Sequence, residues 1–270
     1  MSDAEPTTPG ADGDEVRDLV RTQFGANAAN YAASPVHARG SSLTRLVEVL
    51  EPDPSWRLLD IATAAGHTAF AFAPAVAEVV ASDLLDEMLD VARGQAAERG
   101  VANVTFEVAD AESLPFEDSS FDAVTCRIAP HHFPRPDRFV AEVARVLRPG
   151  GRFGLVDNMV DAEASAFVNH FEKRRDPSHV RALSLDEWLE LVEAAGMSVT
   201  AVERLRKRMV FETWADNMSV PDPVRVELLA DLESAPDAAV AYLEPELGEP
   251  GDQSAAAFHL TEGVVAATRP

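Results

Sequence analysis

The chain has few of the residues on which several classes of protein depend. Its 270 residues include one cysteine, Cys126, and two lysines, Lys173 and Lys207. A single cysteine excludes an intramolecular disulfide framework. No uninterrupted apolar run approaches the ~18 residues that cross a bilayer, and the acidic N-terminus lacks the residue order of a signal peptide. We therefore expect a cytoplasmic protein without membrane insertion.

Positive charge is scarce as well. The chain has 23 Lys and Arg against 46 Asp and Glu, and its formal net charge is −23. Phosphate recognition depends on clustered Lys and Arg, so we expect no nucleic-acid partner. The excess of acids, with arginine strongly preferred over lysine, has two explanations. One is a GC-rich genome; the other is a cytoplasm of high salt, where counterions screen the carboxylates and molar KCl should raise stability markedly.

Strand and helix patterns alternate through the middle of the chain. The patterns predict strands at 57–62, 78–83, 104–108, 121–126 and 152–157, and helices at 66–72, 86–99 and 136–147. This alternation implies right-handed crossovers and a parallel sheet covered by helices on both faces. Two later strands, at 198–210 and 256–268, complete the count. We therefore predict an α/β fold with a doubly wound, mostly parallel seven-stranded sheet and a helical lid.

The remaining segments are predicted to complete one domain over residues 15–270. A tail of residues 1–14, rich in Pro, Gly and Asp, is expected to be disordered. Cap helices are expected over 16–40, the ligand-binding core over 55–160, and the lid over 160–182 and 212–250. Between the two lid segments, Ser184 and Glu187 have the spacing of a capping box at a helix start.

Acidic residues follow the first three strands, where a doubly wound sheet binds its ligands. They are Asp60, Asp83 and Asp110, and no Lys or Arg lies in these three loops. The pyrophosphate-binding pattern G-x-G-x-x-G is absent. An acid-rich site suits a ligand with hydroxyls, amines and positive charge, which S-adenosylmethionine (SAM) combines. Asp83 would then accept both ribose hydroxyls and Asp110 the adenine amino group; helix capping is the simpler explanation for any one of them.

The same residues stand in blocks that resemble the class I SAM-dependent methyltransferases, in particular the ubiquinone and menaquinone C-methyltransferases (methyltransferase type 11-like). The blocks are LLDIATAAGHTAFAFAP, VVASDLLDEMLDVAR, VTFEVADAESLPFEDSSFDAVTCRIAPHHF and VARVLRPGGRFGLVD. The resemblance covers about residues 16–160, and FVNHFEKRRDPSHVRALSLDEW is similar to bacterial members of the group. It implies a Rossmann-like fold that converts SAM to S-adenosylhomocysteine. We predict methyl transfer to a small apolar or aromatic metabolite.

The resemblance assigns the loop after the first strand to the methionine part of the cofactor. The residues concerned are Asp60, Ala62, Thr63, Ala64 and Gly66. The family loop has two or three glycines, and here Ala62, Ala64 and Ala65 stand where glycine is possible, while Gly66 is kept. At Ala64 a glycine would give positive φ or a close backbone approach to the ligand. An alternative function is therefore a protein of the same fold with weakened or lost methylation, acting in binding, regulation or a non-methyl reaction.

The resemblance also assigns the adenosine part. Asp83 would bind the ribose, Leu84 and Met88 would line the adenine, and Asp110 with the Ala111 amide would bind the adenine edge. These five positions lie at or after the ends of the second and third strands. The backbone around Arg127, after the fourth strand, would close the site near the sulfonium.

Two neighbouring histidines are the catalytic candidates. Displacement from a sulfonium releases a neutral leaving group and needs no acid, but the nucleophile can need a base. His131 and His132 follow the fourth strand, and we expect one of them to face the cavity; the alternative is that both serve packing. His37, in the cap region, is a weaker candidate for contact with the substrate.

The remaining assignments concern the substrate and partners. The resemblance places Tyr31 over the cofactor or the substrate. Arg175 would bind an anionic group of the substrate, or else form an ion pair with Glu172 or Asp176. No spacing of His, Cys or Asp indicates a metal site. The expected partner is a small molecule, and the oligomeric state is left open, with a homodimer as the candidate.

Overall fold

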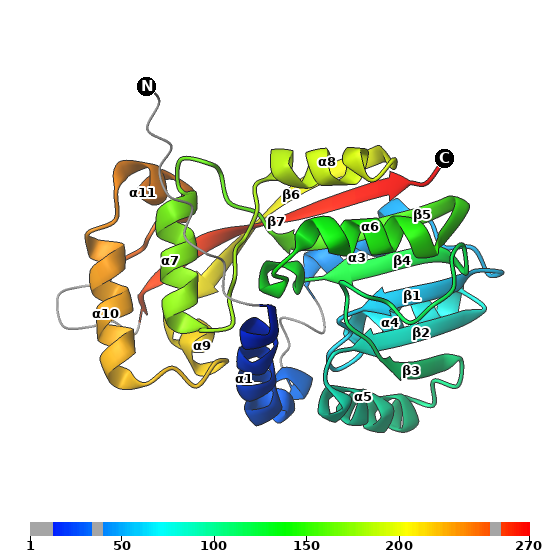
Figure 1. Cartoon of the computed structure of the whole chain (residues 1–270). Helices are drawn as coiled ribbons and strands as arrows, with labels where there is room; N and C mark the ends of the chain where they lie inside the picture. Colours follow the sequence, from blue (N-terminus) through cyan, green and yellow to red (C-terminus); the bar gives the residue numbers. More distant parts are fainter. Residues whose placement is uncertain (1–12, 34–39, 249–254) are drawn as a thin grey trace.

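A seven-stranded sheet forms the centre of the molecule. The structure, a computed structural model, describes residues 13–33, 40–248 and 255–270, with residues 25–33 described by their backbone. The strands are β1 (Arg57–Ile61), β2 (Glu78–Asp83), β3 (Val104–Val108), β4 (Phe121–Arg127), β5 (Leu147–Asn158), β6 (Ser198–Val210) and β7 (Ala257–Thr268). They lie in the order β3-β2-β1-β4-β5-β7-β6 (Figure 1). The first five run parallel, and β7 is antiparallel to β5 and β6, which confirms the predicted fold class.

Helices cover both faces of this sheet. The helices α3 (Ser41–Leu50), α4 (His67–Phe72) and α5 (Asp86–Arg99) pack on one face, and α6 (Pro136–Val146) and α8 (Leu185–Ala194) on the other. Successive strand residues point to opposite faces. Leu58 therefore packs under the first group and Leu59 under the second. Because both faces are buried at the centre of the sheet, β1, β2 and β4 contain consecutive buried residues, whereas alternate residues of the edge strand β6 are exposed.

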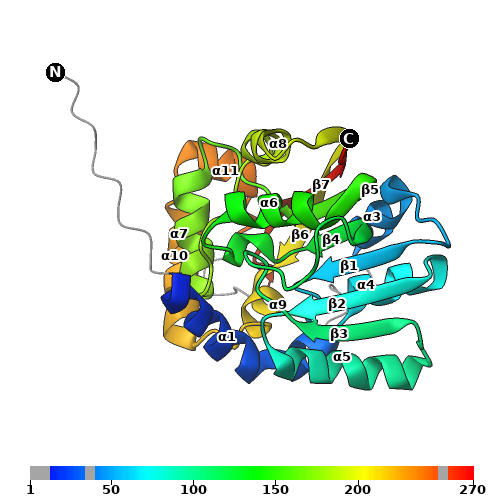
Figure 2. The same ribbon diagram turned by 45° about the vertical axis from the view of Figure 1, so that its right-hand side comes forward.

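A second group of helices gathers around the far ends of β6 and β7, in the region where a lid is predicted. It consists of α7 (Ser165–Arg175), α9 (Phe211–Asp216), α10 (Asp222–Glu233) and α11 (Asp237–Leu243). Their core is aromatic: Phe171 stacks on Trp214 at 5.0 Å between ring centroids, and Phe258 meets Trp214 edge-on at 4.9 Å. In Figure 2 the helix α1 (Gly13–Ala33) runs from this group toward α5, which it contacts.

Two of the predicted boundaries were wrong. The helix α1 begins at Gly13, inside the predicted tail, whose residues 1–12 lie outside the described ones. The strand β5 begins at Leu147 rather than at 152, because Leu147 pairs with Phe121 and a bulge follows before Arg152. The segment 212–245 is expected from its sequence to be helical with breaks at Pro221, Pro223 and Pro236, and it contains three helices separated near Pro221 and Pro236.

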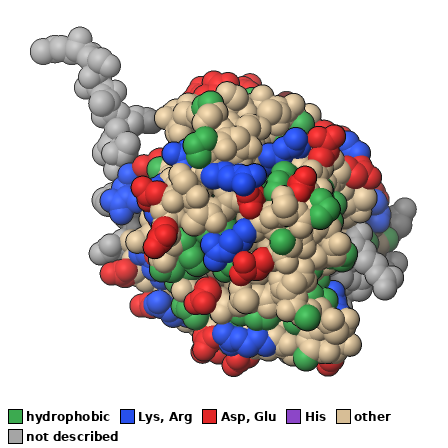
Figure 3. Space-filling view, turned by 90° about the vertical axis from the view of Figure 1, so that its right-hand side faces the viewer, with side chains coloured by type: hydrophobic (Ala, Val, Ile, Leu, Met, Phe, Trp, Pro, Cys, Tyr) green, Lys and Arg blue, Asp and Glu red, His purple; other side chains and the backbone are tan. Residues whose placement is uncertain are grey.

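The amino ends of the parallel strands form a face of mixed charge (Figure 3). Arg57 pairs with Glu78 on the neighbouring strand, and Arg152 with Glu51 at the end of α3. Basic and acidic side chains lie intermixed on this face, with scattered hydrophobic ones between them. No helix in the described part of the chain is long and apolar enough to cross a membrane.

Candidate functional site

A pocket opens at the carboxyl ends of the parallel strands, next to β1 and β4, where the strand order reverses. Its empty volume is about 1100 Å³, including the part open to solvent. One side, here the strand-end wall, follows β1, β2 and β3 and consists of Ile61–Ala65, His67, Thr68, Asp83–Leu85, Met88 and Ala109–Glu112. The other side, here the cap wall, consists of Val16, Arg17, Val20 and Phe24 from α1 together with Arg127, Ile128, Ala129, His132, Phe133 and Pro134.

Asp60 lies behind the pocket and does not line it, contrary to the predicted contact. Its side chain is buried and accepts hydrogen bonds from the hydroxyls of Thr63 (2.6 Å) and Thr125 (2.8 Å). Burial raises the pKa of Asp60 to about 6, against the opposing effect of these two bonds. The carboxylate therefore ties the loop after β1 to the neighbouring strand β4, and its effect on a ligand passes through that loop.

The loop after β1 makes an unusual turn. Ala62 and Ala64 both have left-handed backbone conformations, with φ of 52° and 48°, and Gly66 before α4 has φ of 85°. This conformation costs a non-glycine residue about 1–2 kcal/mol. The alanines line the pocket, whereas Gly66 lies outside the lining and supplies the turn into α4. The structure therefore explains the family preference for glycine here by positive φ.

Asp83 connects the loops after β1 and β2. Its Oδ2 accepts a hydrogen bond from the Ala64 amide (2.9 Å) and its Oδ1 from the Leu85 amide (3.1 Å). Burial raises the pKa of Asp83 to about 6, against these bonds. A carboxylate oxygen has two acceptor positions. Each oxygen therefore keeps one for a ligand, and the pair suits a vicinal diol.

Asp110 lines the pocket and is tied to the cap. The Arg17 Nε donates to Asp110 Oδ2 (2.8 Å), and another guanidinium nitrogen of Arg17 donates to Glu112 Oε2 (3.2 Å). The Glu112 amide donates to Asp110 Oδ1 (2.9 Å). These contacts close α1 over the end of the pocket where an adenine amino group is predicted.

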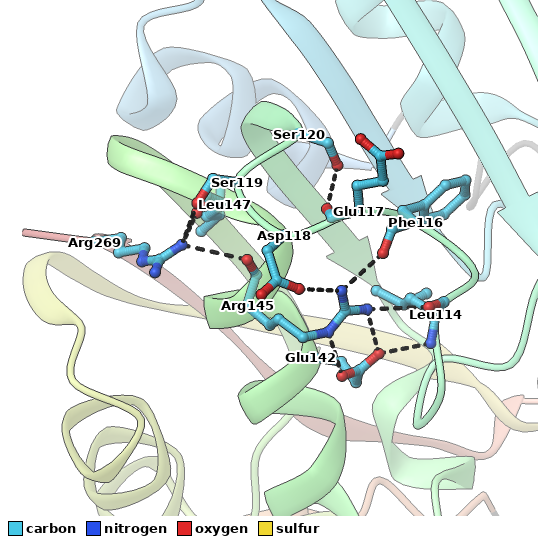
Figure 4. A network of polar contacts seen from close by, with 10 residues as sticks. All are labelled: Leu114, Phe116, Glu117, Asp118, Ser119, Ser120, Glu142, Arg145, Leu147 and Arg269. Atoms are coloured by element: carbon cyan, nitrogen blue, oxygen red, sulfur yellow. Dashed lines mark hydrogen bonds and ion pairs between the residues drawn. The ribbon is translucent and has the colours of Figure 1, made fainter.

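The loop that carries Asp110 is braced from behind by Arg145 on α6 (Figure 4). Its guanidinium donates to the carbonyls of Phe116 (2.7 Å) and Leu114 (3.0 Å) and to both oxygens of Glu142 (2.7 Å each). The Leu114 amide in turn donates to Glu142 (2.7 Å). The backbone groups of the loop after β3 are therefore held by the side chains of Arg145 and Glu142, which gives Asp110 a defined position.

The chain leaves β4 through a third pocket-lining, non-glycine residue with a left-handed backbone. Ile128 has φ of 54°, which is rare for a β-branched side chain, and its amide donates to the Val156 carbonyl at 2.7 Å. Such strain clusters at functional sites. Before it, the Arg127 side chain is buried and donates from Nε to the Thr68 hydroxyl (3.1 Å), so the end of β4 contacts the start of α4 beside the strand-order switch.

The two candidate histidines point in different directions. His132 lines the pocket, in the short 3-10 helix η2 (Pro130–His132), whereas His131 lies outside the lining. His131 Nδ1 lies 2.6 Å from the buried Asp157 Oδ1. Burial lowers the pKa of His131, but the charge and hydrogen bond of Asp157, together with the nearby acids Glu172 and Asp176, raise the pKa above its usual value. Burial and the charge of His131 lower the pKa of His132 to about 4, so His132 is neutral at pH 7.

Of the predicted substrate residues, the structure describes the side chain of Arg175, which does not line the pocket. The Arg175 guanidinium is 4.6 Å from the Trp214 ring centroid and 3.5 Å from Glu172. The structure therefore corrects its substrate role to the ion-pair alternative. The Tyr31 side chain and His37 lie outside the described residues. Among the described residues, no cluster of three or more His, Cys, Asp or Glu side chains suits a metal ion.

Sequence reasoning missed most of the cap wall. Val16, Val20 and Phe24 recur at helical spacing in the sequence, but this spacing does not say what the apolar face covers. Arg17 has Asp14 as a local partner at 3.3 Å, so no unpaired charge signalled its contact with Asp110. Phe24 packs edge-on against His132 with 5.0 Å between ring centroids.

The donor set of the strand-end wall fits SAM. It offers carboxylates at Asp83 and Asp110 for hydroxyl and amino donors, and apolar contacts at Leu84 and Met88 for a base. A dinucleotide site places a pyrophosphate at the positive N-terminal end of a helix. Here the helix α4 has six residues, and the carboxylates of Asp83 and Asp110 lie in the wall beside it. The pocket therefore suits a positively charged nucleoside better than a dinucleotide.

Comparisons with known proteins agree with this geometry. A family model described as a methyltransferase domain matches residues 59–155. The uncharacterised methyltransferase YcgJ of Bacillus subtilis is 40% identical over 220 residues, covering 81% of this chain and 87% of that protein. The crystal structure of YcgJ has a TM-score of 0.82 to this chain at 37% identity, covering 86% of this chain and 99% of that one. The ubiquinone/menaquinone biosynthesis C-methyltransferase UbiE of Brucella anthropi is 43% identical over 104 residues, 37% of this chain and 40% of that protein. The chain therefore belongs to the methyltransferase family, with the class I fold and SAM as its cofactor.

Proposed function

We propose that the protein transfers the methyl group of SAM to a small apolar or aromatic acceptor whose nucleophilic atom carries a proton, and that His132 takes up this proton. The observation that carries the proposal is the shared pocket: an acidic strand-end wall faces a largely apolar cap wall that contains one partly buried, neutral imidazole. A neutral imidazole can accept a proton, whereas an imidazolium cannot.

The strand-end wall would hold the cofactor. Asp83 would accept both ribose hydroxyls, Asp110 and the Ala111 amide would bind the adenine edge, and Leu84 and Met88 would pack against the ring. The loop after β1, with Thr63 held by Asp60, would hold the methionine part. When bound, SAM supplies a methyl group on positively charged sulfur and leaves as a neutral thioether.

The cap wall would hold the acceptor. Val20, Phe24 and Phe133 offer apolar surface, and Phe24 packs against the ring of His132. This arrangement would exclude water and place the acceptor between the base and the cofactor. Alignment of reacting groups is the main catalytic contribution in such a displacement, worth up to about 7–11 kcal/mol in favourable cases.

Titration calorimetry tests the cofactor site. We expect one SAM or S-adenosylhomocysteine per chain, and Asp83→Ala should weaken binding at least about 100-fold, because two hydrogen bonds to a charged group are lost. Asp90→Ala on the exposed side of α5 is the matched control and should bind normally. If the natural chain fails to bind at millimolar ligand while Ala64→Gly binds tightly, the protein has left methylation and the proposal is wrong.

An acceptor screen tests the reaction. S-adenosylhomocysteine release is measured with phenols, hydroquinones and enolisable diketones, each beside its O-methylated analogue, which lacks the titratable proton. We expect turnover with members of the first set alone. His132→Gln should then lose about 100-fold or more in turnover while it still binds SAM, whereas His170→Gln on α7 should match the natural chain. Equal turnover by His132→Gln would contradict the role of His132.

A further inference from the structure

The segment that follows α7 packs against the turn that carries His132. The Val180 and Arg181 amides donate to the His131 carbonyl at 2.9 and 3.0 Å. His132 Nδ1 lies 3.1 Å from the Ser178 carbonyl oxygen and 3.3 Å from the Ser178 hydroxyl oxygen. Residues 176–181, here the holding segment, therefore bring main-chain groups to a ring 46 residues away in the sequence.

Hydrogen bonds within the holding segment fix its turn. The Ser178 hydroxyl donates to Asp176 Oδ1 (2.6 Å), and the Ser178 amide donates to the same oxygen (2.9 Å). The His179 amide donates to the Asp176 carbonyl (2.9 Å). Asp176 and Ser178 are both buried, with 4% and 1% of their surface exposed. The turn at Ser178 is therefore set by one carboxylate oxygen.

These bonds decide which nitrogen of His132 carries the proton. A carbonyl oxygen can only accept a hydrogen bond. The Ser178 hydroxyl hydrogen is already donated to Asp176, so the hydroxyl oxygen too can only accept from the ring. Both atoms that face Nδ1 are acceptors, and Nδ1 must therefore carry the hydrogen. In the neutral ring this leaves the lone pair on Nε2.

We propose that Asp176 and Ser178 are positioning residues that hold His132 as the Nδ1–H tautomer, so that Nε2 is the atom that accepts the proton of the methyl acceptor. The role of Nε2 in taking up a proton rests on the proposed function. The tautomer of His132 does not, because it follows from the contacts within this chain. Asp176 Oδ2 lies 3.9 Å from Nε2, beyond hydrogen-bond distance, and it is the nearest carboxylate to the imidazolium that proton uptake would form.

The surroundings of His132 are charged on several sides. The titratable and charged groups that act on His132 or on the adjacent His131 come from η2, β5, α7 and the holding segment. They are His131, Asp157, Glu172, Arg175, Asp176 and His179. His131 and Arg175 oppose a positive charge on His132, and Asp176 favours it. The ring is therefore neutral before the reaction and has a carboxylate nearby afterwards.

Nitrogen NMR of the full chain with labelled histidine tests the tautomer without any substrate. His132 is assigned by the signals missing from His132→Gln. At pH 7 we expect a protonated Nδ1 and an unprotonated Nε2. Asp176→Ala should release the turn and give a mixture of the two tautomers, whereas Asp176→Asn should keep the Nδ1–H form, because the asparagine Oδ1 can accept the same two bonds.

Each outcome decides the proposal. An Nε2–H tautomer in the natural chain overturns the proposal. An unchanged Nδ1–H form in Asp176→Ala overturns it too. If Asp176→Ala does not fold, the natural chain and Asp176→Asn still decide. His170, which contacts Arg174 outside this network, is the internal reference and should keep its signals in every variant. SAM calorimetry on the same samples separates this result from a failed cofactor site: the variants should bind within about twofold of the natural chain, and absence of binding in all of them, the natural chain included, would overturn the proposed function alone.

Discussion

The strand-end wall and the cap wall enclose one pocket but are built differently. The strand-end wall comes from loops directly after β1, β2 and β3, and its carboxylates are held by nearby amides, such as that of Leu85 two residues from Asp83. The cap wall joins α1 to the turn after β4 and depends on contacts between distant segments, such as the 93 residues between Arg17 and Asp110. The first wall is therefore held within the sheet and the loops and helices that adjoin it, whereas the second wall also needs α1 in place.

The strand-end wall should therefore respond to pH through its own carboxylate, independently of the cap. Burial raises the pKa of Asp83 to about 6. Between pH 7 and pH 5 its ionised fraction falls from about nine-tenths to about one-tenth, so the Kd for SAM should rise about tenfold if the ionised form binds the ribose. Calorimetry across this range measures the change.

Asp83→Asn is the control for this pH dependence. It should bind more weakly than the natural chain but with an affinity nearly constant from pH 7 to pH 5. The stability of the ligand-free chain should move in the opposite direction. A carboxyl whose pKa is raised in the folded state binds its proton more tightly there than in the unfolded chain, so this group favours folding more as the pH falls from about 6 to about 4. A steady Kd for the natural chain would show that Asp83 does not meet the cofactor as an anion.

The same contrast between the walls explains what the sequence could predict. The positions of Asp83 and Asp110 followed from the strand pattern, because the residue after a parallel strand lies at the carboxyl edge of the sheet. The capping box of Ser184 and Glu187 is also local and forms as predicted. Such features depend on neighbours within a few residues, and their spacing is visible in the sequence.

Features that depend on distant contacts were not visible. The sequence could not say which of His131 and His132 faces the pocket, because the turn after β4 is rotated by its bonds to the holding segment. Nor could it show that Asp60 turns away from the ligand toward Thr125, 65 residues later. The start of β5 was missed for the same reason, since Gly150 and Gly151 exchange hydrogen bonds with Arg269 near the end of the chain.

The cap wall should become looser when its contact with the strand-end wall is removed. Arg17→Ala deletes the hydrogen bonds to Asp110 and Glu112, which are partly exposed and worth about 1 kcal/mol together. We expect S-adenosylhomocysteine to dissociate about fivefold faster, measured by stopped-flow displacement. Arg21→Ala is the matched control, because Arg21 pairs with Asp18 on its own helix. Slower release would mean that Arg17 competes with the adenine for Asp110.

The smallest expected effect tests the strain within the strand-end wall. Ala64 has φ of 48°, where glycine is free of the clash that an alanine Cβ meets. Ala64→Gly should relieve about 1–2 kcal/mol of strain but gives back part of this through the larger entropy of unfolded glycine. We expect a net gain of about 0.5 kcal/mol in the free energy of unfolding, which raises Tm by about 1–2 °C for a chain of this size.

The control for Ala64→Gly is the same change in a right-handed helix. Ala97 is exposed on α5, and Ala97→Gly should cost about 1 kcal/mol, so the two substitutions shift Tm in opposite directions. Calorimetric scans of both variants measure the difference. If Ala64→Gly destabilises the chain as Ala97→Gly does, the left-handed turn is not strained. If it stabilises the chain and leaves the Kd for SAM unchanged, the alanine at this position costs stability and not affinity, and the strand-end wall tolerates its departure from the family pattern.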